Sequence, residues 1–159
     1  MKLTASTINT ASISTLTNSL TERLTAPVCV GYQHNDAFPG SHPLFAGPLG
    51  YNGSKAGMEL IQQADVVLAL GTRLNPFSTL PGYGLDYWPA GAKIIQVDIN
   101  PNRIGLTKPV TVGIVGDAKK VAEGILARLS KTAGDAGRAD RKALIAQKKS
   151  AWAQQLSSM

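Results

Sequence analysis

Residues 64–75, ADVVLALGTRLN, decide the fold, because a continuous apolar run ends abruptly in Gly71, Thr72 and Arg73. Two further stretches end in the same way: KIIQVDINPNRIG at 93–105 and VTVGIVGDAKKV at 110–121. Strands buried on both faces have continuous apolar runs of this kind, which are typical of parallel sheets. Ligands of open α/β sheets bind where such strands end. The sequence therefore predicts an α/β fold, an open parallel sheet with a ligand-facing edge.

Composition limits the size and class of the protein. The chain has 159 residues, of which 43% are hydrophobic and 16% charged, so it can bury one core and we expect one domain with appendages. The net charge is +6, and the residues after Ser130 carry six basic and two acidic side chains. A basic tail of this kind is typical of a solvated helix face, so we expect no nucleic-acid partner.

The cysteine content and the hydropathy pattern predict a soluble, cytoplasmic protein. Cys29 is the single cysteine, and its place in the apolar segment 27–30 predicts that it packs as a small hydrophobe. No apolar run reaches the roughly 18 residues of a membrane span. The N-terminus also lacks the apolar block of a secretory signal. We therefore expect no membrane partner.

Periodicity and capping residues locate the expected elements along the chain. Apolar runs predict strands at 27–31, 65–70, 93–97 and 110–115. Helical spacing predicts helices at 14–24, 54–64, 118–131 and 141–156, with Ser54 and Asp117 as N-caps and a short helix opened by Pro101. Segments 32–53 and 75–92 are expected to be irregular, and 132–140 a linker. The apolar face of the last helix has no obvious partner, which predicts a connection to an absent segment.

Polar residues follow three of the predicted strands. Gly71 and Arg73 follow the strand at 65–70, Asp98 follows the strand at 93–97, and Asp117 follows the strand at 110–115. The carboxyl ends of parallel strands meet at one edge of a sheet, where nucleotides bind in doubly wound folds. We therefore regard these four residues as a candidate site for a nucleotide-like ligand. Asp117 has a second interpretation, as a helix cap.

Three glycines lead into the helix predicted from Ser54. Gly47, Gly50 and Gly53 are spaced by three residues, so the amide groups at the helix start could hold an anion. The spacing is not that of a Walker loop or of the dinucleotide fingerprint. The alternative is that the glycines let a tight loop cross close to the sheet.

The segment 32–53 also contains both histidines of the chain. His34, Asp36 and His42 either bind a metal or act as acid and base, or they are hydrogen-bonded loop residues, and their spacing is not diagnostic. The sequence contains no recognisable motif of a nucleophile beside a base and no paired carboxylates that would organise hydrolysis. We therefore predict no catalytic and no metal-binding residue in this chain.

Three stretches together resemble a known family. HPLFAGPLGYNGSKAGMELIQQADVVLALGTRLN at 42–75, KIIQVDINPNRIG at 93–105 and VGIVGDAKKVAEGIL at 112–126 resemble the middle domain of thiamine-diphosphate-dependent enzymes of the acetohydroxyacid synthase type. The resemblance covers residues 26–159. It implies a Rossmann-like (DHS-like) open parallel sheet of six strands with helices on both faces. The chain has no apolar run before the helix at 14–24, so we expect the first strand of this sheet to be missing.

The resemblance also implies a fragment of a larger enzyme. Residues 1–25 are a non-matching, Ser/Thr-rich start with a partial helix, 26–131 the middle domain, and 132–159 a linker and helix leading to an absent C-terminal domain. The family's pyrimidine- and pyrophosphate-binding domains, which bind thiamine diphosphate and Mg²⁺, are expected partners that this chain lacks. Residues 116–118 are Gly-Asp-Ala rather than the Gly-Asp-Gly of the pyrophosphate domain. We expect the fragment alone to be inactive and the intact parent to be a homo-oligomer.

Within this family, residues 31–61 and 81–105 are most similar to an acetyltransferase branch. The implied reaction of the intact parent converts a sulfonated aldehyde and phosphate to acetyl phosphate and sulfite, and the chain would be its central scaffold domain. In some relatives the middle domain holds FAD or an adenine nucleotide near positions that match Arg73, Asp98 and Asp117. The alternative function is therefore a free-standing nucleotide-binding module of the FAD or ADP type, using Gly71 as well as these three residues.

Overall fold

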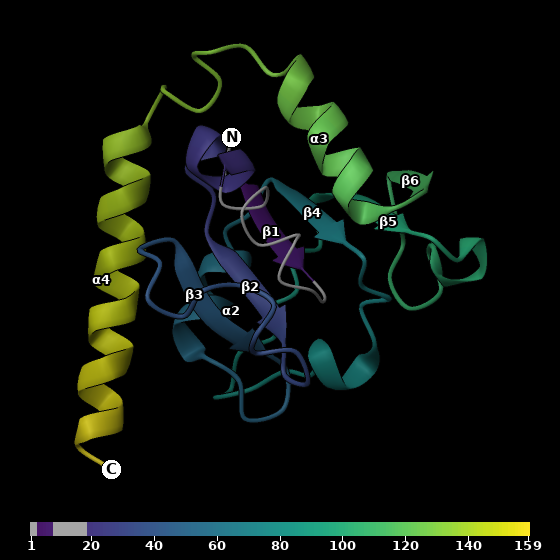
Figure 1. The fold of residues 1–159 in the computed structure, drawn as a ribbon. Helices are drawn as coiled ribbons and strands as arrows, with labels where there is room; N and C mark the ends of the chain where they lie inside the picture. The colour runs from purple at the N-terminus through teal and green to yellow at the C-terminus, as the bar shows by residue number, and fades with distance from the viewer. Residues whose placement is uncertain (1–2, 8–18) are drawn as a thin grey trace.

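Six parallel strands form one sheet in the order β3-β2-β1-β4-β5-β6 in the computed structural model, which describes residues 3–7 and 19–159 (Figure 1). The strands are β1 Leu3–Thr7, β2 Val28–Gly31, β3 Phe45–Leu49, β4 Val66–Leu70, β5 Lys93–Asp98 and β6 Val112–Val115. This is the strand order of the doubly wound, Rossmann-like fold, in which the winding direction reverses between β1 and β4. The predicted fold class is therefore confirmed.

The sheet contains a first strand, so the expectation that this strand is missing was wrong. β1 lies at the centre of the sheet, where Ala5 is opposite Val28 of β2 and Leu68 of β4. The expectation depended on an apolar run, whereas the segment 3–7 reads LTAST. Thr is β-branched and favours strands, and the backbone edges of β2 and β4 both need a partner at this position. Backbone pairing therefore places β1 where hydrophobicity alone did not.

The segment 32–53 is not one long loop, because it contains the edge strand β3. Its residues Gly47 and Pro48 are unusual in a strand, and the ladder between β2 and β3 shifts register between Val28 and Cys29. Proline is tolerated in an edge strand, because such a strand has only one neighbouring strand and the missing N–H group can lie on its unpaired side. This position at the edge explains why β3 has no apolar strand pattern.

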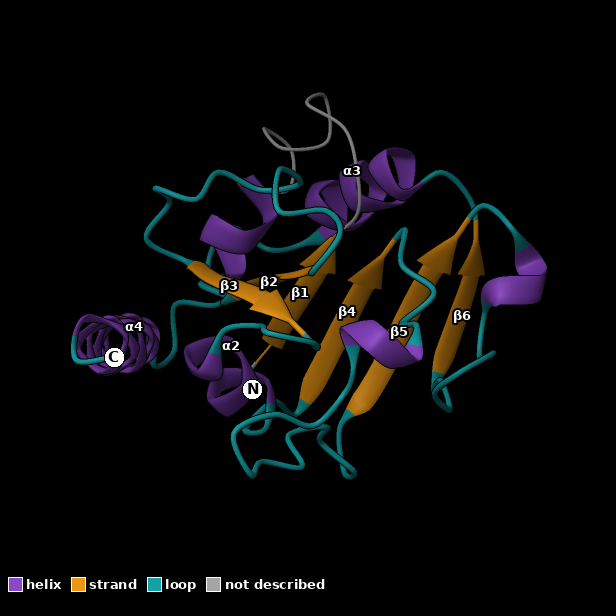
Figure 2. Cartoon of the chain, turned by 90° about the horizontal axis from the view of Figure 1, so that it is seen from below, coloured by secondary structure: helices purple, strands orange, loops and turns teal. Residues whose placement is uncertain are grey.

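Helices cover both faces of the sheet (Figure 2). Helix α2, Lys55–Ile61, packs on one face, and α3, Ala118–Arg128, packs on the other together with the helical residues 19–24. Strand β4 contributes buried side chains to both faces of the sheet. Val67 belongs to the hydrophobic cluster under α2, and Leu68 and Leu70 belong to the cluster under α3. Burial on both faces is the reason for the continuous apolar run of this strand.

The predicted helix starts are confirmed by their capping bonds. The hydroxyl of Ser54 accepts a hydrogen bond from the N–H of Gly57 at 3.2 Å, and the carboxylate of Asp117 accepts one from the N–H of Lys120 at 2.9 Å. Two short 3₁₀ turns are also present: η1 Pro76–Ser78 lies in the segment expected to be irregular, and η2 Pro101–Arg103 is the short helix predicted to open at Pro101. Residues 19–24 confirm the end of the helix predicted at 14–24, whose residues 14–18 lie outside the described residues.

Cys29 packs as the sequence predicts. Its side chain is fully buried in the cluster under α2, and this burial raises the pKa of the thiol to about 12. A thiol with so high a pKa is protonated near neutral pH and is a poor nucleophile. The residue therefore has a packing role rather than a reactive one.

The last helix, α4 Arg138–Ser157, has a partner within the chain, so the expectation that its apolar face is unpartnered was wrong. It lies along α2 (Figure 1) and buries Ile145 against the core. Lys148 forms an ion pair with Glu59 at 2.8 Å, and the ring of Trp152 meets that of Tyr83 with centroids 5.0 Å apart. Much of this contact is polar or aromatic, which a search for an apolar stripe does not detect. Within the described residues, no helix combines the length and the apolar character required to cross a membrane.

Gly50 provides a test of the packing between the loop after β3 and η1. It has a φ of +85°, and a Cβ atom there would lie 1.9 Å from the carbonyl oxygen of Phe77. We predict that Gly50→Ala lowers the free energy of unfolding by about 3 kcal/mol, because both the backbone conformation and the close contact oppose a side chain. Gly91→Ala is the control, since a Cβ atom there meets no atom within 4 Å. Urea denaturation measures both, and equal effects of the two substitutions would contradict the prediction.

Candidate functional site

A cavity of about 460 Å³ lies at the edge of the sheet where the strands end, and we call it the carboxyl-edge cavity. Segments that follow β2, β4 and η2 supply its lining, which consists of Tyr32, Gln33, Arg73, Asn75, Pro76, Phe77, Leu106 and Thr107. In doubly wound folds, ligands bind outside the carboxyl ends of the strands, next to the point where the strand order reverses. The volume is also in the range of small-molecule pockets. This cavity is therefore the candidate binding site of the fold.

The turn after β4 forms one wall of the carboxyl-edge cavity. Gly71 has a φ of +63°, and its N–H group donates to the carbonyl oxygen of Val97 at 2.7 Å, which extends the pairing of β4 with β5. The hydroxyl of Thr107 donates to the carbonyl oxygens of Arg73 at 2.8 Å and Leu74 at 2.7 Å. These bonds fix the backbone of the turn and leave the Arg73 side chain exposed at the cavity.

The side chain of Gln96 in β5 stabilises the turn after β4, which forms one wall of the cavity. Its side chain is 1% exposed, and its amide nitrogen donates to the carbonyl oxygens of Thr72 at 2.9 Å and Arg103 at 3.1 Å. Its amide oxygen accepts a hydrogen bond from the N–H of Gly105 at 2.8 Å. One buried amide therefore links the turn after β4 to the segment after η2. Sequence reasoning missed Gln96, although a polar residue inside an apolar strand was a usable signal.

Part of the cavity lining is aromatic, and we call this part the aromatic wall. Tyr32 directly follows β2, and its ring lies 6.5 Å from that of Phe77, centroid to centroid, at an angle of 53°. The carboxamide oxygen of Asn75 accepts a hydrogen bond from the N–H of Ser78 at 2.9 Å and fixes the start of η1. Sequence reasoning did not assign Tyr32 to the site, although it follows its strand just as Arg73 follows β4.

The four residues predicted for a nucleotide-like ligand lie at the same edge of the sheet, but only Arg73 is among the residues that line the cavity. Gly71 is engaged in backbone pairing. Asp98 is 3% exposed, and its carboxylate accepts a hydrogen bond from the N–H of Asn100 at 2.8 Å. Asp117 caps α3. The carboxylates of Asp98 and Asp117 thus each accept a structural hydrogen bond, whereas the side chain of Arg73 is exposed at the cavity.

The glycines before α2 fit the interpretation of close backbone crossing. A Cβ atom at Gly47 would lie 2.6 Å from the Cβ of Ser54, and one at Gly53 would lie 2.7 Å from the carbonyl oxygen of Pro48. Helix α2 itself has seven residues. The glycines therefore have a steric role in the loop.

His42 is held by hydrogen bonds within its loop. Its Nδ1 atom accepts from the N–H of Leu44 at 3.1 Å, so its Nε2 atom is the donor toward the carboxylate of Glu22 at 3.2 Å. The N–H group of His34 donates to the carbonyl oxygen of Gly31. Across residues 3–7 and 19–159, no group of three His, Cys, Asp or Glu side chains is arranged to hold a metal ion.

Comparisons with known proteins agree on one family. The family model described as "Thiamine pyrophosphate enzyme, central domain" matches residues 4–125. A sulfoacetaldehyde acetyltransferase from Roseovarius nubinhibens is 82% identical over 143 residues, which are 90% of this chain and 24% of that protein. The acetolactate synthase large subunit of Haemophilus influenzae is 32% identical over 109 residues, which are 69% of this chain and 18% of that protein.

A solved structure shows the same architecture. An enzyme from Mycobacterium smegmatis, assigned as thiamin diphosphate-dependent, matches with a TM-score of 0.62 and 26% sequence identity. The match covers 82% of this chain and 25% of that chain. The family match begins at residue 4 and therefore includes four of the five residues of β1, the strand that the sequence did not reveal.

Gln96 provides a test of how the carboxyl-edge cavity is built. We predict that Gln96→Leu lowers the free energy of unfolding by about 3 kcal/mol, because it leaves two carbonyl groups and one N–H group without their partner. Gln147→Leu on the exposed side of α4 is the matched control. Urea denaturation measures the stability, and amide hydrogen exchange at Gly105 reports the lost bond. Unchanged exchange at Gly105 in the Gln96 variant would contradict this role.

Proposed function

The chain belongs to the central-domain family of thiamine pyrophosphate enzymes, and from this membership we propose that it is the central scaffold domain of a sulfoacetaldehyde acetyltransferase. The intact parent would convert sulfoacetaldehyde and phosphate to acetyl phosphate and sulfite. The observation that carries the proposal is the contrast in identity: the chain is far more similar to sulfoacetaldehyde acetyltransferases than to acetolactate synthases. A difference in sequence identity of this size favours the interpretation that the parent of this chain acts on the same substrate as the more similar group.

The chain spans about a quarter of the length of the curated relatives it matches. We propose that the pyrimidine- and pyrophosphate-binding domains of the parent lie outside these 159 residues, and that α4 with its preceding linker leads toward the second of them. The linker and α4 both lie beyond residue 125, where the family match ends. These domains, together with further copies of the parent, are the proposed partners.

The residues at 116–118 do not fit the diphosphate and Mg²⁺ of the family's cofactor. Asp117 is occupied as the N-cap of α3, and Ala118 begins that helix where the pyrophosphate motif has a glycine. We therefore assign thiamine diphosphate and Mg²⁺ to the parent's other domains and derive no chemical step from this chain.

An apolar surface near the carboxyl ends of β5 and β6 supports the scaffold role. Ile99 is 73% exposed, Leu106 is 64% exposed and Val115 is 60% exposed. Large apolar side chains that gather at a surface commonly mark a contact with another protein surface. We propose that this surface contacts the other domains of the parent polypeptide.

One observation favours a second candidate function, a nucleotide-binding module of the FAD or ADP type. The carboxyl-edge cavity lies where such ligands bind in this fold, and the exposed guanidinium of Arg73 at this cavity can pair with a phosphate. The structural hydrogen bonds of Asp98 and Asp117 favour the scaffold function instead. The proposed site would use Arg73 together with the backbone at Gly71.

A domain exchange tests the proposed acetyltransferase function. The 143 matching residues of the Roseovarius nubinhibens enzyme are replaced by those of this chain, and sulfite release from sulfoacetaldehyde and phosphate is measured with thiamine diphosphate and Mg²⁺ present. We predict a rate within about tenfold of the parent's, which corresponds to at most about 1.4 kcal/mol of lost transition-state stabilisation. The matched control carries the segment of the acetolactate synthase. A chimera that assembles like the parent but releases no sulfite would overturn the proposal.

A titration separates the scaffold from the nucleotide-binding module. We predict that neither ADP nor FAD raises the melting temperature of the 159-residue chain in a saturable way, because a ligand stabilises only the state to which it binds. Arg73→Gln is the control variant. Saturable stabilisation that Arg73→Gln abolishes would favour the module over the scaffold.

A further inference from the structure

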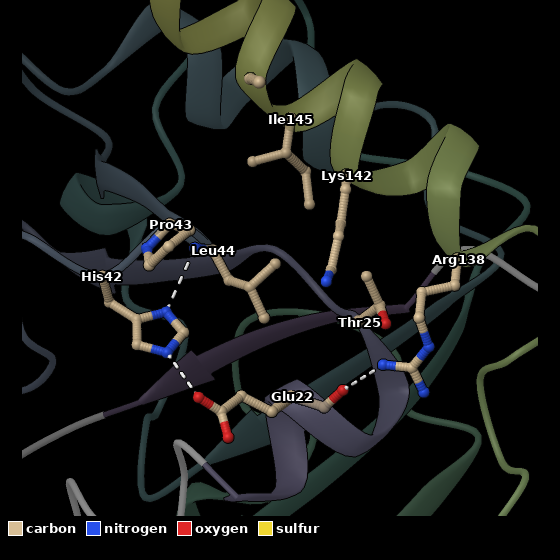
Figure 3. Close-up of a pocket in the computed structure, with 9 residues that line it drawn as sticks. Glu22, Thr25, His42, Pro43, Leu44, Arg138, Lys142 and Ile145 are labelled. Carbon is tan, nitrogen blue, oxygen red and sulfur yellow. Dashed lines mark hydrogen bonds and ion pairs between the residues drawn. The ribbon is translucent and has the colours of Figure 1, made fainter.

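A second cavity, of about 450 Å³, lies at the opposite edge of the sheet, and we call it the amino-edge cavity (Figure 3). The turn before β2, the loop before β3 and the first turns of α4 surround it. Its lining residues are Glu22, Thr25, His42, Pro43, Leu44, Arg138, Lys142, Ile145 and Ala146. Leu44 and Ile145 are 5% and 2% exposed, so the cavity has a buried apolar wall. None of these residues lines the carboxyl-edge cavity.

Thr25 occupies a backbone position that usually belongs to glycine. Its N–H group donates to the carbonyl oxygen of Glu22, and the N–H group of Ala26 donates to that of Thr21. This pair of bonds is the Schellman motif that ends the helical residues 19–24, and it places Thr25 at a φ of +51°. A β-branched residue is strained in this region, whereas glycine is not. Ending the helix therefore does not explain the choice of threonine.

The hydroxyl of Thr25 is also buried without a partner. The residue is fully buried, and its Oγ1 atom has no hydrogen-bond partner in the described part of the chain. A buried hydroxyl is normally hydrogen-bonded, because it has lost its bonds to water. Thr25 thus combines backbone strain with an unused donor, and it does so in the wall of a cavity. Residues of this kind cluster at ligand sites.

The charges around the cavity favour an anion. Figure 3 shows the side chain of Lys142 extending from α4 into the cavity toward Thr25. The guanidinium of Arg138 also lies beside Thr25, but it is paired with the carboxylate of Asp135 at 2.6 Å and donates to the carbonyl oxygens of Glu22 at 3.0 Å and Arg23 at 3.3 Å. The one carboxylate in the lining, that of Glu22, is turned toward the ring of His42 at 3.2 Å. Among the described residues, Lys142 is therefore the cation of the lining that no carboxylate pairs, and it extends toward the unpaired hydroxyl.

We propose that the amino-edge cavity binds a small organic oxyanion, a carboxylate or a sulfonate on a short apolar body. The hydroxyl of Thr25 donates to one anion oxygen, and the ammonium of Lys142 pairs with the charge. Leu44 and Ile145 contact the apolar body. The site is independent of the proposed acetyltransferase function, since it depends on this chain's residues alone.

The experiment titrates the ¹⁵N-labelled 159-residue chain with benzoate and, separately, with benzenesulfonate. We expect saturable shifts of the amide resonances of Thr25, Leu44 and Lys142, with benzyl alcohol binding at least about tenfold more weakly because it lacks the charge. A response to one of the two anions alone identifies which oxyanion the cavity takes. Equal affinity for benzyl alcohol, no saturable shift with either anion, or a spectrum without dispersed resonances would overturn the proposal.

Matched variants assign the interaction to the two residues. Thr25→Val keeps the β-branched shape and removes the hydroxyl, so we expect the dissociation constant to rise about tenfold or more while the melting temperature is unchanged or higher. Thr25→Ser keeps the hydroxyl and should restore binding. Lys142→Gln should weaken binding similarly, whereas Lys120→Gln on the exposed side of α3 should not. Unchanged affinity in Thr25→Val, or a lower melting temperature of that variant, would overturn the assignment.

Discussion

The pairing of β1 with both β2 and β4 is the constraint on which the rest of the structure depends. These ladders join the pair β2 and β3 to the group β4, β5 and β6, which otherwise share no strand neighbour. The winding direction reverses at the same place, so the carboxyl ends of the two groups diverge there and leave room for a cavity. The architecture and the position of the carboxyl-edge cavity both follow from this central pairing.

The two edges of the sheet are organised by different means. At the carboxyl edge, the buried amide of Gln96 connects two loops through three hydrogen bonds. At the amino edge, α4 closes the space, with Ile145 in the core and Arg138 on the turn that ends the helical residues 19–24. One edge therefore depends on a single strand residue and the other on a helix from the far end of the chain.

The sequence predicted those features that depend on neighbours along the chain. Apolar runs located β2, β4, β5 and β6, and Ser54 and Asp117 were recognisable as caps because their bonds close within three residues. β1 and the role of Gln96 depend on partners far away in sequence, which local patterns do not carry. For the candidate site, the edge and Arg73 were predictable, whereas the aromatic wall needed the strand order.

Parallel pairing at the centre of the sheet has a consequence for folding. Leu3 is opposite Val66, so the strand that comes first in this sheet cannot be enclosed on both sides until β4 has also been synthesised. Contacts between residues distant in sequence slow folding, because the chain loses conformational freedom before it gains their stabilisation. The first strand of this sheet in chain order is thus among the last to be secured.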